Sequence, residues 1–129
     1  EIIKLAGEML GKAGKRCVAI YGDIPKEQRG DIVKQFQTDP DTMVIVGQID
    51  TLGVGVTLTA ADTCVYYSVN WNYATYEQSL SRIHRLGQKH PCLYIHLITE
   101  KTVDETVMKA LARKEDLAKT IVDNWREYF

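Results

Sequence analysis

Arg82 and Arg85 stand three positions apart in the segment QSLSRIHRLGQ, residues 78–88. Residues three and four positions apart share one face of a helix, so the spacing predicts a helix that presents Gln78, Arg82 and Arg85 together. A guanidinium is always charged, and its planar donors fit two phosphate oxygens at once. Two of them on one face suit a polyphosphate ligand. Ordinary surface arginines on a solvated helix would show the same spacing.

A second group of residues surrounds a Gly-x-Gly pair, Gly53 and Gly55, with Thr51 just before it. Such a pair lets the backbone approach a phosphate or a sugar closely. A tight turn filled with small residues is the alternative interpretation. Arg29 follows Pro25 in an expected helix, where it is a candidate phosphate contact or, equally, a solvated helix charge.

These residues must be positioned by an alternation of helices and strands. Short apolar runs predict buried strands, and helical spacing of apolar residues predicts helices between them. This alternation indicates an α/β domain with a parallel sheet flanked by helices. Ligands bind at the carboxyl ends of such strands, so we expect the glycine pair and the approach to Arg82 and Arg85 to gather there. The expected strands cover residues 17–21, 43–47, 64–68 and 93–98.

Composition excludes several classes of protein. The chain has 129 residues, 45% of them hydrophobic, which suits one domain over residues 1–129 with a real core. No apolar run approaches the ~20 residues that a bilayer requires, so we expect no membrane association. A net charge of −1 argues against a large basic surface for nucleic acid, so any contact with DNA would have to be local. The spacing of Cys17, Cys64 and Cys92 predicts no metal site.

Two longer stretches resemble a known family. Gln78, Arg82, His84, Arg85, Gly87 and Gln88 meet the fixed positions of the sixth conserved motif of superfamily II helicases in its Swi/Snf-type form, and residues 53–72 are similar to the fifth motif. The resemblance implies the second RecA-like (P-loop NTPase-like) lobe of a DNA translocase. It also implies that Arg82 and Arg85 are arginine fingers, that Gln78, Gly53 and Gly55 contact ATP, and that Thr51 and Arg29 contact nucleic acid.

The same resemblance carries expectations about the rest of the protein. ATP and Mg²⁺ would be held mainly by a first lobe, because the Gly-x-x-x-x-Gly-Lys-Ser/Thr loop and the Asp-Glu-x-His box do not occur in this sequence. The chain would then be part of a longer two-lobed protein and inactive alone. The expected substrate is DNA, double-stranded by family analogy, and the expected location is the cytoplasm, or the nucleus of a eukaryote.

One departure from the family pattern keeps a second function open. Where the family usually carries Ser-Thr-Arg-Ala-Gly, this chain has Gln48, Ile49, Asp50, Thr51 and Leu52. Asp50 would repel a DNA phosphate. A non-catalytic nucleic-acid-binding or scaffold module that retained the helicase fold is therefore the alternative.

Overall fold

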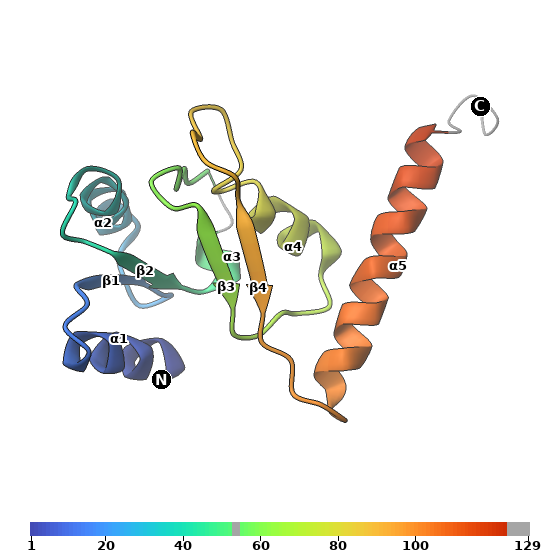
Figure 1. Cartoon of the computed structure of the whole chain (residues 1–129), viewed down its shortest axis with the longest axis horizontal. Helices are drawn as coiled ribbons and strands as arrows, with labels where there is room; N and C mark the ends of the chain where they lie inside the picture. Colours follow the sequence, from blue (N-terminus) through green and yellow to red (C-terminus); the bar gives the residue numbers. More distant parts are fainter. Residues whose placement is uncertain (53–54, 124–129) are drawn as a thin grey trace.

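Helices and strands alternate along the chain, as the apolar pattern predicts. The computed structural model describes residues 1–52 and 55–123, with side chains up to residue 116. The elements occur in the order α1 (Ile2–Lys12), β1 (Cys17–Ile20), α2 (Lys26–Thr38), β2 (Val44–Gly47), α3 (Ile49–Leu52), β3 (Thr63–Tyr66), α4 (Tyr73–Leu80), β4 (Leu93–His96) and α5 (Val103–Asp123) (Figure 1).

The strands of the described residues form two parallel pairs. β1 pairs with β2 from Cys17 opposite Val44 to Ile20 opposite Gly47. β3 pairs with β4 from Thr63 opposite Leu93 onward. Parallel pairing is the predicted arrangement and is confirmed, although it occurs as β1–β2 and β3–β4 and not as one continuous sheet.

The core lies between the two strand pairs and joins them. Phe36 on α2, Leu58 before β3 and Ile83 after α4 form one buried cluster. Burying a side chain of this size contributes roughly 1.5–3 kcal/mol relative to leaving it exposed. Partly buried residues from both strand pairs pack against the cluster: Val18, Val33, Ile45, Val56, Ala61, Cys64, Cys92 and Tyr94.

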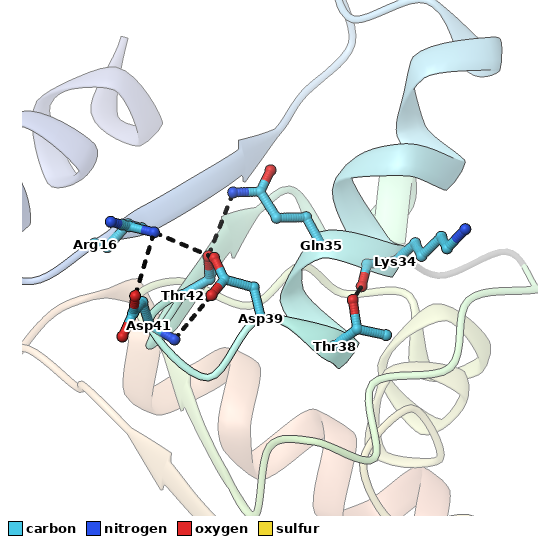
Figure 2. A network of polar contacts seen from close by, with 7 residues as sticks. All are labelled: Arg16, Lys34, Gln35, Thr38, Asp39, Asp41 and Thr42. Atoms are coloured by element: carbon cyan, nitrogen blue, oxygen red, sulfur yellow. Dashed lines mark hydrogen bonds and ion pairs between the residues drawn. The ribbon is translucent and has the colours of Figure 1, made fainter.

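A polar network ties the amino ends of β1 and β2 together (Figure 2). Arg16 Nη1 lies 3.4 Å from Asp39 Oδ2 and 3.7 Å from Asp41 Oδ2. The buried hydroxyl of Thr42 donates to Asp39 at 2.7 Å. That hydrogen bond is the main cause of the lowered pKa of Asp39, to which Arg16 also contributes. The network closes the turn between α2 and β2.

The β3–β4 pair has one packed face and one exposed apolar face. Tyr66 and Tyr94 point toward α4, where Tyr66 Oη lies 2.6 Å from Ser79 Oγ and Tyr94 Oη donates to the carbonyl of Leu80. Successive strand residues point to opposite sides. The other face accordingly carries Val65, which is 54% exposed, and Ile95, which is 39% exposed.

The helix predicted to run through both arginines is shorter than expected. α4 begins after Asn72, whose side chain accepts from the backbone N–H of Thr75 at 3.2 Å, and it ends at Leu80. Ser81 Oγ donates to the carbonyl of Gln78 at 2.8 Å, so a hydroxyl takes an acceptor that helix continuation would use. The chain then turns, and Leu86 is 99% exposed.

A short helix, α3, follows β2 after one residue. The N–H groups of Thr51 and Leu52 donate to the carbonyl of Gln48 at 3.1 Å and 2.9 Å. Gly47 ends β2 just before this turn. A Cβ at Gly47 would overlap the Leu52 side chain and lie 2.9 Å from the Ile20 carbonyl oxygen. The glycine therefore permits α3 to fold back against the strand end.

The described residues contain neither a membrane-spanning helix nor a metal-binding cluster. No described helix combines the length and apolar composition that crossing a membrane requires. Within residues 1–52 and 55–116, no three His, Cys, Asp or Glu side chains form a group suited to a metal ion.

Candidate functional site

Arg82 lies in the turn that follows α4, at the amino ends of β3 and β4. Its carbonyl accepts from the N–H of Leu58 at 2.9 Å, and its Nη1 donates to the Val56 carbonyl at 3.4 Å. Residues 56–58 lead into β3, so these bonds place Arg82 where the strand begins. α4 returns the chain from the far ends of the strands to this edge (Figure 1). The approach to the arginines therefore begins at the carboxyl end of β3, as predicted, but Arg82 itself lies at the opposite ends of the strands.

The two arginines are close enough to influence each other. Burial lowers the pKa of Arg82, and the positive charge of Arg85 lowers it further. Arg82 is partly buried and Arg85 is exposed. The carbonyl of Arg85 accepts from the N–H of Gln88 at 2.9 Å, which holds Arg85 within the same turn. Two neighbouring like charges at the surface favour an anionic ligand.

Gln78 is the predicted partner of the arginines on a shared helical face. Gln78 lies within α4 and is exposed, whereas Arg82 and Arg85 follow the end of that helix. The helical alignment of the three side chains is consequently not formed. Arg82 and Arg85 lie near each other, as their spacing predicted, but in a turn and not on a helix.

Arg29 and Thr51 lie at a different place, the carboxyl ends of β1 and β2. Arg29 donates through Nε to the Ile24 carbonyl at 2.9 Å and through Nη2 to the Gly22 carbonyl at 3.2 Å. Gln48 Oε1 accepts from the N–H of Gly22 at 3.1 Å and from Thr51 Oγ1 at 3.3 Å. Arg29 and Thr51 are thus linked through Gly22 and Gln48. Sequence reasoning missed the role of Gln48, an amide placed directly after a buried strand.

The predicted glycine pair is described in part. Gly53 lies outside the described residues. Gly55 has φ +69°, and no described atom lies within 4 Å of the position that a Cβ would take. A side chain would strain this left-handed backbone although space is available. Gly55 belongs to the segment that leads from α3 to Val56. Val56 contacts the turn after α4 that carries Arg82 and Arg85, which we call the arginine turn.

The architecture defines the class of domain. The crystal structure of the C-terminal part of the Fun30 ATPase domain superposes with a TM-score of 0.79 at 19% sequence identity. The match covers 85% of this chain and 35% of that one. With parallel strands flanked by helices, the chain has the RecA-like α/β fold.

Sequence comparison identifies the family. Residues 1–87 match the helicase conserved C-terminal domain, and the chain belongs to that family in its Swi/Snf-type form. It is 33% identical over 121 residues to a chromatin-remodeling ATPase INO80 of Emericella nidulans, covering 94% of this chain and 8% of the relative. Against the INO80 ATPase of Candida albicans, identity is 27% over 123 residues, with 95% and 9% covered. The chain thus spans less than a tenth of these relatives.

Proposed function

We propose that this chain is the second motor lobe of an ATP-dependent DNA translocase and that Arg82 and Arg85 are its arginine fingers. The observation that carries the proposal is the turn after α4, where a half-buried and an exposed arginine lie close together. The family match and the names of its relatives, which are ATPases, support the reaction class.

The positive charge of the turn fits the polyphosphate of ATP. In this proposal ATP and Mg²⁺ are held mainly by the first lobe, and the metal supplies neutralisation of the phosphate charge. Gln78, Gly53 and Gly55 contact the nucleotide from this lobe. Arg82 and Arg85 stabilise the charge that builds on the transferred phosphoryl group when the lobes close. Residues 1–129 alone should not hydrolyse ATP, because their sequence has neither phosphate-binding loop nor metal-binding box.

In this proposal, nucleic acid binds at the second group of residues, Arg29 and Thr51. Arg29 donates two hydrogen bonds, to the carbonyls of Ile24 and Gly22, and these bonds fix the guanidinium. Its other N–H donors can then bind a phosphate. Thr51 contributes from α3. We infer double-stranded DNA as the substrate and the nucleus as the location, since the relatives are named as chromatin-remodeling enzymes.

The test is DNA-stimulated ATP hydrolysis by the complete two-lobed protein. Arg82→Ala and Arg85→Ala should each lower kcat by roughly a thousandfold while ATP still binds, because the finger acts in the transition state. Arg113→Ala is the matched control, since Arg113 is an exposed arginine on α5. If both finger variants hydrolyse ATP as the unchanged protein does, the assignment is wrong and the scaffold function becomes the better explanation.

A further inference from the structure

A single turn of backbone, Leu58–Ala61, connects α2 with the arginine turn. The N–H of Ala61 donates to the carbonyl of Leu58 at 3.0 Å, which closes the turn. The N–H of Leu58 donates to the carbonyl of Arg82, so the position of this turn sets the position of the Arg82 backbone. The turn is held from two sides by glutamine side chains.

Gln37, in the last turn of α2, holds one side. Its Oε1 accepts from the N–H of Ala60 at 2.7 Å, and its Nε2 donates to Thr59 Oγ1 at 3.2 Å. Both partners lie more than twenty residues away in the sequence, so these are tertiary contacts. The amide of Gln37 therefore joins the end of α2 to the turn.

Gln88 holds the other side. Its Nε2 lies 2.8 Å from the Ala61 carbonyl oxygen and 3.0 Å from that of Ile83, with Thr59 O at 3.4 Å. An amide has two N–H donors, so Ala61 and Ile83 are the main acceptors. Gln88 Oε1 accepts from the N–H groups of Lys89 and His90 at 2.9 Å and 3.0 Å. One side chain thus binds the turn and the chain on both sides of Arg85.

We propose that Gln37 and Gln88 form a glutamine clamp that positions the arginines for ATP hydrolysis. The clamp makes α2, the turn 58–61 and the arginine turn move as one body. This inference rests on the proposed function of Arg82 and Arg85. Neither glutamine touches nucleotide in this proposal; both are positioning residues that act through backbone.

The hydrogen-bond chemistry of the clamp predicts an asymmetry between two equivalent changes. In Gln37→Glu the carboxylate still accepts from the Ala60 N–H, and the Thr59 hydroxyl can reverse and donate to it. In Gln88→Glu the carboxylate faces the carbonyl oxygens of Ala61 and Ile83, which have no proton to donate. The first change preserves the clamp, whereas the second replaces two bonds by repulsion between acceptors.

The kinetic test uses the two-lobed protein with saturating DNA at pH 7.5. We expect Gln88→Glu and Gln88→Met to lower kcat about tenfold or more with little change in KM for ATP, because misplaced catalytic groups cost rate and not ground-state binding. Gln37→Leu should lower kcat in the same way, whereas Gln37→Glu should retain it. Gln28→Leu is the control, since Gln28 is an exposed glutamine on the same helix.

A second readout separates the clamp from the function that it serves. Amide hydrogen exchange over residues 56–64 should become faster in Gln88→Met and in Gln37→Leu, while global thermal unfolding of these variants is compared with that of Gln28→Leu. Equal kcat for Gln37→Leu and Gln37→Glu, or faster exchange without any loss of kcat, would overturn the positioning role. If Arg82→Ala and Arg85→Ala retain full activity, the finger proposal fails, and hydrogen exchange alone then decides whether the clamp exists.

Discussion

Burial governs the ionisable side chains on the packed face of β3 and β4. The His96 ring stacks on Tyr66 with ring centroids 4.8 Å apart, and Tyr76 Oη lies 3.0 Å from His96 Nε2. Loss of solvent is the first cause of each shift: it raises the pKa of Cys64, Tyr66 and Tyr76 and lowers the pKa of His96. Burial therefore favours the neutral form of each of these side chains.

The lowered pKa of His96 predicts an acid-sensitive domain. Between the folded-state pKa and the ordinary value near 6.5, the unfolded chain binds more protons than the folded chain. The free energy of unfolding therefore rises with pH across that interval and falls as the pH drops below about 6.5. Urea unfolding at pH 5 and at pH 7.5 measures the effect.

Two variants check that His96 is the responsible group. In His96→Phe an aromatic ring remains beside Tyr66 but cannot titrate, so the difference between the two pH values should shrink. His90→Ala is the control because the His90 side chain is exposed, and it should leave the difference unchanged. The explanation fails if both variants show the pH dependence of the unchanged chain.

At the scale of elements, local pattern predicted what local physics determines. The apolar runs located all four described strands to within two residues, and the helix that carries Arg29 was expected. The end of α4 was not predictable, because Arg82 leaves the helix to place its carbonyl on the N–H of Leu58, a contact across the fold. α3 was not predicted. Its single turn is closed by the carbonyl of Gln48, which accepts from the N–H groups of Thr51 and Leu52. For the candidate site, the sequence spacing predicted that Arg82 and Arg85 lie near each other but did not predict which strand ends they lie beside, and their role in catalysis stays a prediction.

The junction between β2 and α3 gives a stability prediction. Gly47→Ala should lower the free energy of unfolding by about 1–3 kcal/mol, because the new methyl group meets the Ile20 carbonyl and Leu52 in a packed site. Gly30→Ala is the opposite case: Gly30 lies within α2 with open space around its Cβ position. That change should raise stability by about 0.5–1 kcal/mol through helix propensity. Urea denaturation of both variants tests the pair, and a loss of stability in both would contradict it.

At the scale of the whole molecule, the two strand pairs meet through a small core while one face of β3–β4 stays exposed. Val65, Ile95 and their neighbours Leu93 and Leu97 present apolar side chains on that face. Contiguous apolar surface on a domain promotes association. Because these side chains are exposed, they contribute little to the core.

Replacing two of these side chains should reduce self-association with little loss of stability. We expect Val65→Thr together with Ile95→Thr to reduce self-association of the chain, measured by sedimentation at increasing concentration. The free energy of unfolding should change by less than about 1 kcal/mol, because both positions are exposed and threonine suits a strand. Phe36→Ala marks the other extreme, with an expected loss of roughly 3–5 kcal/mol from the buried cluster. A large destabilisation of the threonine variant would show that this face is packed in solution.

The pairing of the strands also bears on how the chain acquires its structure. β1 pairs with β2 and β3 with β4, so each strand pairs with a strand that comes directly before or after it in the order of the described strands. Closing a short loop costs less chain entropy than closing a long one, and local pairing speeds folding. Pairing within each half is therefore favoured early in folding, and Phe36, Leu58 and Ile83 complete the core when the halves meet. On the ribosome, the first strand pair can be complete before the residues of the second have been synthesised.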